Sequence, residues 1–218
     1  MRRIAVIGLS TFGTLLVRTL AEERCYVLAV DLNEQKINMI RDVANEAAIA
    51  DARDPRALEA LRLHEYDVVV LSLGEPLDAS LLAALHLRDL NVRQILAKAM
   101  SEDHRRLLQR VGVADVIFPE GDMAQRTAYT LARPQLLDTL QLSEEISLIE
   151  IAPPKELVGH SLAELNLRQK YGVTVVAIRD LLRHDLRVNP DPHALITESD
   201  ALLVLGKEEN VQHFARER

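Results

Sequence analysis

The stretch IAVIGLSTFG, residues 4–13, decides the fold class of this chain of 218 residues. Its four leading apolar residues predict a buried strand, and the glycines that follow predict a tight turn into a helix. In the G-x-G-x-x-G loop of dinucleotide-binding folds, the first glycine makes the turn, the second lets the backbone approach a pyrophosphate, and the third lets helix and strand pack closely. Gly8 and Gly13 stand in the first and third places, whereas Ser10 stands in the second.

Ser10 places a side chain where a bound phosphate would come closest to the backbone. The hydroxymethyl group either moves the phosphate outward or offers it a hydroxyl donor in place of bare backbone. We expect phosphate binding in both cases, because the start of the following helix presents unpaired N–H groups and the positive end of the helix dipole. The loop is a weak motif by itself, so the surrounding pattern carries the prediction.

Outward from this loop, strand-like and helical patterns alternate up to about residue 118. Short apolar runs rich in β-branched residues lie at 4–7, 26–30, 47–50, 67–71, 94–97 and 115–117. Apolar residues recur at helical spacing at 14–23, 34–43, 55–61, 77–90 and 102–111. Parallel strands need crossover helices and are apolar on both faces. The pattern predicts an α/β fold, a Rossmann-like doubly wound parallel sheet of six strands.

Polar residues follow several of these strands. Asp31 comes 18 residues after Gly13, where a carboxylate accepts hydrogen bonds from both ribose hydroxyls and repels a 2′-phosphate. Its alternative role is to cap the helix that begins near Asn33. Asp51 could contact an adenine edge, whereas Asp54, before a proline, is expected to cap a helix.

The segment SLGEP, residues 72–76, closes the fourth strand with a small residue and a glycine. This composition is expected where a chain passes a ligand at the switch point of the sheet. The alternative interpretation of this segment is an ordinary turn.

A further helical stretch at 122–132 precedes the segment RPQLLDTLQLSEE, residues 133–145, which breaks the α/β rhythm with a proline. We therefore expect a first domain at 1–134 and a second at 135–218, the latter with a linker helix and a smaller α+β part. Strand-like runs at 147–151, 173–178 and 201–205, a helical piece at 161–166, a loop at 187–196 and a final polar helix from 208 support this. So small a domain would gain stability from pairing with a second copy.

Composition excludes several classes of function. The net charge of −7, from 33 acidic and 26 basic residues, argues against a nucleic acid or an anionic membrane as the main partner. The basic run at 104–110 contains no aromatic residue and is interpreted as the solvated face of a helix. The single cysteine, Cys25, lies in an apolar run, which predicts a small buried residue in a reducing cytosol. No stretch approaches the roughly 20 apolar residues that span a bilayer.

The chain also lacks the usual motifs of catalysis. It contains no C-x-x-C, H-E-x-x-H, G-x-S-x-G or P-loop, and its seven histidines are scattered, with His160 and His193 expected on the surface. A dehydrogenase would need a general acid or base over its nicotinamide, and the second domain offers no clear candidate. A nucleotide-sensing module is therefore favoured over an enzyme, with an NAD-dependent oxidoreductase and a stand-alone sensor as alternatives.

The whole chain resembles the regulatory subunits of bacterial potassium uptake systems of the Ktr/Trk type, which join an RCK (or KTN) nucleotide-binding domain to an RCK C-terminal domain. The segments that carry the resemblance are AVIGLSTFG, VLAVDLNEQKI, VVVLSLGEPLDASLLAALHLRDL, ILAKAMSEDHRRLLQRVGVADVIFPEGDMA, LAELNLRQKYGVTVVAIRD and DALLVLG. Residues 97–123 are far more specific than the glycine loop. A single RCK unit resembles Ktr more than the tandem Trk subunit.

The resemblance implies a site for an adenine nucleotide, ATP or ADP, with NAD possible. The residues it implies are Gly8, Ser10, Thr11, Phe12, Gly13, Asp31, Leu32, Asp51, Ala52, Ser72, Leu73, Gly74, Lys98 and Glu120. Lys98 would lie near the phosphates, and Glu120 would help to hold a divalent metal cation. Without the resemblance, Lys98 is interpreted as a surface lysine at the end of a strand. Glu120 is interpreted as an acidic residue that favours the start of a helix. Family members commonly carry glycine at position 10 and arginine at 11, so the charge that would reach a γ-phosphate is missing here.

The resemblance also concerns assembly. Some relatives bind cyclic di-AMP at a dimer interface of the C-terminal domain, where the matching positions are Leu162, Ala163 and Arg168, and Ala163 is smaller than the usual branched residue. The implied partners are further copies of the chain, in dimers and an octameric ring, and a potassium-translocating membrane protein, with no nucleic acid. The implied role is a non-enzymatic gating subunit in the cytoplasm, peripheral to the inner membrane.

Overall fold

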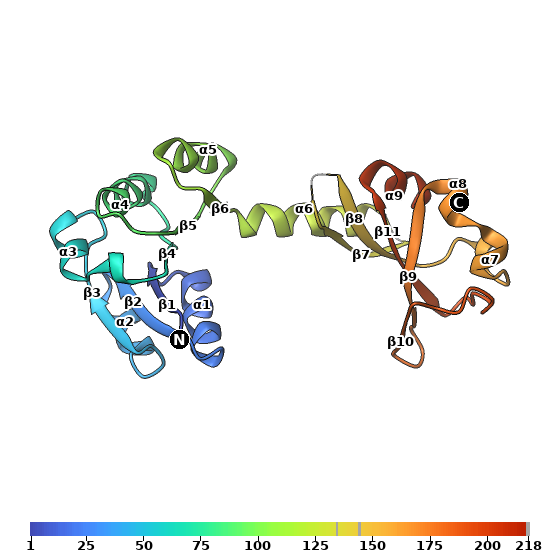
Figure 1. The fold of residues 1–218 in the computed structure, drawn as a ribbon, viewed down its shortest axis with the longest axis horizontal. Helices are drawn as coiled ribbons and strands as arrows, with labels where there is room; N and C mark the ends of the chain where they lie inside the picture. Colours follow the sequence, from blue (N-terminus) through green and yellow to red (C-terminus); the bar gives the residue numbers. More distant parts are fainter. Residues whose placement is uncertain (134, 144, 217–218) are drawn as a thin grey trace. The chain divides into compact units, whose positions relative to one another are not determined.

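The computed structural model describes residues 1–133, 135–143 and 145–216 (Figure 1). The chain divides into two compact units, Met1–Gly121 and Asp122–Arg218. Helix α6 (Pro119–Ala132) crosses this division, which falls before the boundary expected at residue 134. The reason lies in side chains such as Arg126 and Tyr129, which contact the sheet and the core of the second unit.

The first unit contains a parallel sheet of six strands in the order β3-β2-β1-β4-β5-β6. The strands are β1 (Arg3–Ile7), β2 (Tyr26–Asp31), β3 (Glu46–Ile49), β4 (Val68–Leu71), β5 (Ile95–Lys98) and β6 (Asp115–Ile117). The helices are α1 (Thr11–Glu22), α2 (Glu34–Ile40), α3 (Pro55–Ala60), η1 (Leu63–Glu65), α4 (Leu77–Asp89) and α5 (Glu102–Val111). This order is that of a doubly wound fold, so the predicted fold class is confirmed.

Successive residues of the central strands pack into two different apolar clusters. Ala5 and Ile7 belong to one cluster, whereas Ile4 and Val6 belong to the other. Both faces of the sheet are therefore covered, which explains why the strands read as continuous apolar runs. Cys25 is only partly buried beside the second cluster, because it lies just before β2 begins rather than within it.

The second unit contains an antiparallel sheet of five strands in the order β10-β9-β11-β8-β7. The strands are β7 (Leu136–Gln141), β8 (Ile146–Ile151), β9 (Val173–Asp180), β10 (Asp185–Val188) and β11 (Asp200–Lys207). The helices are η2 (Lys155–Leu157), α7 (Leu162–Leu165), α8 (Leu167–Tyr171) and α9 (Glu208–Phe214). The smaller α+β domain is thus present.

Two details of the second unit differ from the sequence-based expectation. The linker helix expected after residue 134 is not found there, since residues 136–141 form strand β7 and the helix, α6, comes before them. Strand β10 begins before the predicted loop at 187–196 and overlaps it. All four residues of β10 are exposed, and its sequence, DLRV, alternates polar and apolar residues over only four positions before a loop with two prolines.

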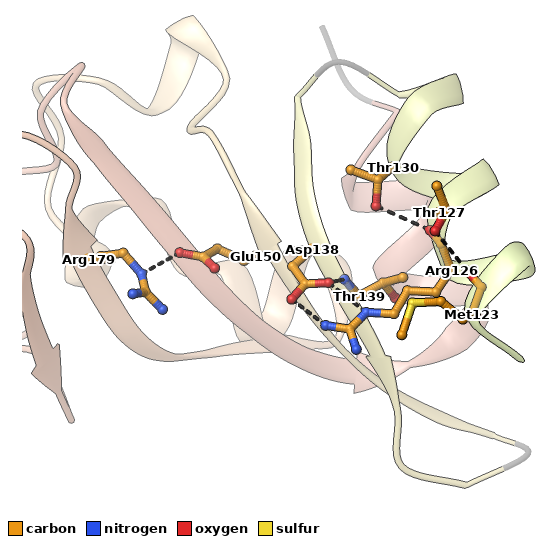
Figure 2. Close-up of polar contacts among 8 residues, drawn as sticks. All are labelled: Met123, Arg126, Thr127, Thr130, Asp138, Thr139, Glu150 and Arg179. Carbon is orange, nitrogen blue, oxygen red and sulfur yellow. Dashed lines mark hydrogen bonds and ion pairs between the residues drawn. The ribbon is translucent and has the colours of Figure 1, made fainter. Parts of the chain in front are cut away.

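Ion pairs connect the elements of the second unit, as Figure 2 shows. Arg126 of α6 donates a hydrogen bond of 2.8 Å to Asp138 of β7, and this guanidinium lowers the pKa of the Asp138 carboxyl. Arg179 of β9 donates across β11 to Glu150 of β8, at 2.6 Å. No helix among the described residues has both the length and the apolar character needed to cross a membrane.

One histidine of the first unit is wholly buried, although the basic run at 104–110 was interpreted as a solvated helix face. His104 has no exposed surface, because its ring turns inward from the first turn of α5. Its Nδ1 accepts a hydrogen bond from the Met100 N–H, and its Nε2 contacts the Ser80 hydroxyl at 2.8 Å. Since that hydroxyl donates to the Leu77 carbonyl, the network assigns a neutral ring with the proton on Nε2.

Burial therefore lowers the pKa of His104 below its ordinary value of 6.5. The unfolded chain then binds the proton more readily than the folded chain, so this contribution to stability is complete above about pH 6.5 and is lost as pH falls towards the lowered pKa. We expect the melting temperature to fall between pH 7.5 and pH 5.5, with His104 responsible for about 2–4 °C of the decrease. In H104Q this share of the pH dependence should disappear.

The control is H64Q, since His64 lies exposed in η1. This variant should keep the pH dependence of the unaltered chain. Equal pH dependence in H104Q and the unaltered chain, measured by thermal unfolding across the same buffers, would contradict the interpretation.

Candidate functional site

The register of the parallel sheet aligns four sequence-predicted residues at its carboxyl edge. Ile7 pairs with Val30 on one side and with Leu71 on the other, and Leu71 pairs with Ala97. The residues that follow these four are, in strand order, Asp31, Gly8, Ser72 and Lys98. Neighbouring strands lie about 4.8 Å apart, so this carboxyl-edge row is about 14 Å long. It spans the switch point between β1 and β4, where ligands bind in such sheets.

The glycines of the loop are required by close backbone contacts. Gly8 has φ +96°, and a Cβ there would lie 2.6 Å from the Ser72 carbonyl oxygen. A Cβ on Gly13 would lie 2.1 Å from the Gly8 carbonyl oxygen. The end of β1 therefore lies directly against the end of β4, and α1 lies directly against the loop. These are the first and third glycine roles that the sequence predicts.

Ser10 fills the place of the middle glycine with a hydroxyl that has two partners. Ser10 is the N-cap of α1, and its Oγ accepts a hydrogen bond from the Gly13 N–H at 3.3 Å. The same Oγ lies 2.7 Å from the Oγ of the buried Ser72. The side chain thus ties the loop to β4.

The first turn of α1 offers free hydrogen-bond donors. The backbone N–H groups of Thr11 and Phe12 make no hydrogen bond to any residue that the structure describes. Such groups at a helix start, together with the helix dipole, favour an anion. Thr11 is exposed and Phe12 is half-buried. This end of the helix can therefore receive a phosphate.

Asp31 is held at the other end of the loop by backbone groups. Its Oδ2 accepts from the Leu9 N–H at 2.6 Å, and its Oδ1 accepts from the Asn33 N–H at 2.8 Å. Lys36 lies 3.5 Å from Oδ2. The cap of α2 is Asn33, so the alternative role of Asp31 as that cap is wrong. Each carboxylate oxygen keeps a lone pair for a hydroxyl donor.

The residues after β3 and β4 have more ordinary surroundings. Asp51 is bound by the guanidinium of Arg53 at 2.7 Å, which lowers the pKa of the Asp51 carboxyl. Asp54 caps α3, as predicted. The remaining predicted residues near the edge are the buried Ala52, the half-buried Leu73 and Gly74, and Leu32, which is 60% exposed.

Lys98 is buried rather than a surface lysine, so that alternative is wrong. Its side chain is 5% exposed, and its Nζ lies 2.6 Å from Oε1 of Glu120 in the first turn of α6. This ammonium lowers the pKa of the Glu120 carboxyl. Both residues were predicted for the site, but sequence reasoning did not predict that they bind each other.

The described residues around Lys98 and Glu120 do not include a complete set of protein ligands for a divalent metal cation. Among the described residues, no group of three or more His, Cys, Asp or Glu side chains is arranged to hold a metal ion. Glu120 supplies one carboxylate, and Lys98 already binds it. The residues present therefore do not form a metal site of their own.

The second unit contains a small hollow of about 170 Å³. Leu162 and Arg168, two of the three positions predicted for cyclic di-AMP, line it together with the start of β9. Ala163 is exposed and does not line it. His160 and His193 are exposed, as predicted.

Comparisons with known proteins agree with this architecture. The family model of the TrkA-N domain matches residues 4–119, and that of the TrkA-C domain matches residues 146–217. Ktr system potassium uptake protein C of Bacillus subtilis is 36% identical, covering 99% of this chain and 96% of that protein. Ktr system potassium uptake protein A of the same organism is 33% identical, with the same coverage.

A solved structure shares the fold of the whole chain. The GsuK channel bound to NAD aligns with a TM-score of 0.71 at 18% identity, covering 99% of this chain. The chain spans only 40% of that longer protein.

The close contact at Gly13 yields a prediction about stability. G13A should lower the free energy of unfolding by about 1–3 kcal/mol in chemical denaturation, despite the higher helix propensity of alanine, because its Cβ meets backbone. The matched control is G74A, since a Cβ at Gly74 meets nothing within 4 Å. That variant should be as stable as the unaltered chain or more stable by about 0.4–1 kcal/mol. Equal stability of the two variants would refute the close packing.

Proposed function

This chain belongs to the family of Ktr/Trk-type potassium uptake regulatory subunits, and we propose that it controls a potassium-translocating membrane protein by binding an adenine nucleotide, ATP or ADP, in its first unit. The observation that carries the proposal is the carboxyl-edge row. In this row Asp31, the loop that begins at Gly8, and Lys98 follow strands that lie side by side at the switch point, which supports a ligand there.

The order of residues in the row would orient a bound nucleotide. Asp31 would accept hydrogen bonds from the ribose hydroxyls, and its charge disfavours a 2′-phosphate. The free N–H groups of Thr11 and Phe12 would receive the first phosphates. The phosphate chain would then pass Ser72 towards Lys98. The exposed Leu32 beside Asp31 offers apolar surface to the adenine.

Position 11 sets the charge available at the loop. Thr11 brings no cation there, so Lys98 is the basic side chain of the row. A divalent cation would need phosphate oxygens or water beside Glu120, because the chain lacks a complete ligand set among its described residues. NAD is the second candidate ligand, since the GsuK channel named above was solved with it.

The proposed action is regulatory rather than catalytic. Relatives that align over nearly the whole chain are potassium uptake proteins, which supports a gating subunit over an oxidoreductase. Two nucleotides that favour different shapes of an oligomer shift the open population of the membrane partner by their difference in affinity. A tenfold preference is about 1.4 kcal/mol for each site, so several coupled sites in a ring would act as a switch.

The same membership supports a proposal about assembly and location. We expect copies of the chain to form dimers and an octameric ring at the cytoplasmic face of the membrane, bound to the potassium-translocating protein. Cyclic di-AMP would bind the second unit near Leu162, Ala163 and Arg168. The hollow there is smaller than the usual 300–1,000 Å³ ligand pocket, so two copies would have to share the ligand.

Isothermal titration calorimetry with ATP, ADP and NAD tests the proposal. The unaltered chain should bind at least one of them, and D31A should weaken that binding about tenfold or more, since hydrogen bonds to a charged group each contribute about 1.5–3 kcal/mol. The matched control is D42A, an exposed aspartate after α2, which should bind normally. No heat from any adenylate, with or without magnesium, would refute the proposal.

A further inference from the structure

Strand β10 is an edge strand of the second sheet, and no described strand lies on its outer side (Figure 1). The Asn189 N–H donates to the Val176 carbonyl of β9 at 3.0 Å. In an antiparallel pair, residues that exchange hydrogen bonds alternate with residues that do not. Arg187 therefore turns its backbone groups towards β9, whereas Leu186 and Val188 turn theirs outward. No described residue contacts these outward groups by a hydrogen bond, so the edge is open to another strand.

On one face of the sheet, β10 extends a row of acidic side chains. Asp185 lies opposite Asp180 of β9, and Asp180 lies opposite Asp200 of β11. Like charges directly opposite each other in a sheet are destabilising. The buried Asp200 binds Arg187 at 2.9 Å, and Asp180 lies 3.8 Å from Arg183. Asp185 is exposed and makes no hydrogen bond or ion pair with any described residue. The row therefore ends at the open edge in a carboxylate that a cation would stabilise.

Arg187 brings such a cation to the same strand. Its guanidinium carries five N–H donors, and the contact with Asp200 uses one nitrogen. The Arg187 side chain is 42% exposed, so further donors can reach a second carboxylate. The segment Asp185–Leu186–Arg187 thus has an acid and a base at equal distances from Leu186. Such a segment is complementary in charge to an antiparallel copy of itself.

We propose that the outer edge of β10 pairs with β10 of a second copy of this chain, antiparallel and centred on Leu186. In this register the two Leu186 residues exchange both backbone hydrogen bonds, and Asp185 of each copy lies opposite Arg187 of the other. A register centred on Arg187 would instead place two arginines directly opposite each other. The contact uses none of the residues that line the hollow near Leu162 and Arg168, and it does not depend on nucleotide binding.

The contact is small and acts together with others. Two strands of four residues bury far less than the roughly 1,200 Å² of a stable interface, so the pair is weak between isolated chains. When several copies are already held in one assembly, the strands meet at a high effective concentration. The charges then select this register over others.

Disulfide cross-linking of the full chain tests this pairing. In a C25A background, which removes the single native cysteine, L186C should form an intermolecular disulfide under mild oxidation. The Cα atoms of a hydrogen-bonded antiparallel pair lie about 5.5 Å apart, within the range of a disulfide.

The matched control is V188C in the same background. Val188 is exposed on the same strand and on the same face as Leu186. In the proposed register the two Val188 residues are four positions out of alignment, or about 13 Å apart, which exceeds the reach of a disulfide. V188C should therefore cross-link at least about tenfold more slowly than L186C.

A change of charge tests the register. Added to L186C, D185R places an arginine opposite Arg187 of the other copy, twice in the symmetric pair, and should slow cross-linking about tenfold. The control E198R makes the same change of charge at an exposed residue outside the strand and should leave the rate unchanged. Thermal unfolding under reducing conditions verifies that each variant folds.

The outcomes separate this inference from the proposed function. If L186C does not cross-link, or V188C cross-links as fast, the pairing is refuted. If D185R slows cross-linking no more than E198R, the charge-matched register is refuted. Both results are read without nucleotide, so a chain that binds no adenylate can still pair through β10, and a chain that does not pair can still bind one.

Discussion

The structure depends on a backbone contact at the switch point of the first sheet. The end of β1 lies so close to the end of β4 that a methyl group on Gly8 would meet the Ser72 carbonyl oxygen at 2.6 Å. A second contact, between Gly13 and the Gly8 carbonyl, brings helix α1 against the same loop. Together they fix where the helix begins. The helix start in turn fixes the position of the free N–H groups that make this edge suitable for an anion.

The serine at position 10 is compatible with this constraint because its side chain has hydrogen-bonding partners within the protein. Its hydroxyl caps α1 and contacts the hydroxyl of Ser72, so a polar group that would crowd a phosphate becomes part of the loop. The same row ends at Lys98, whose charge is balanced by Glu120. The carboxyl-edge row therefore has a charged residue at each end, Asp31 and Lys98. Both residues already have partners within the chain.

Much of the fold could be predicted from the sequence because both faces of the parallel sheet are buried. The apolar runs mark the six strands within one or two residues, and the predicted cap Asp54 marks the start of α3. Strand β10 was missed because its alternation of polar and apolar residues covers only four exposed positions beside a loop with two prolines. The burial of His104 was missed because the residues next to it are charged, while its partner Ser80 lies 24 positions away in α4.

Some contacts of the candidate site could not be predicted from the sequence. The glycines and Asp31 follow a motif with fixed spacing, so their positions could be predicted. The Lys98–Glu120 pair joins residues 22 positions apart, and the Ser10–Ser72 pair joins residues 62 apart, so only the register of the sheet brings them together.

The most direct test of the central claim is hydrogen–deuterium exchange of the full chain with and without ADP. A nucleotide on the carboxyl-edge row should slow exchange of the backbone amides at residues 9–13, 31–33 and 72–74. Unchanged exchange in those three segments, or protection confined to residues 162–175 of the second unit, would contradict the account.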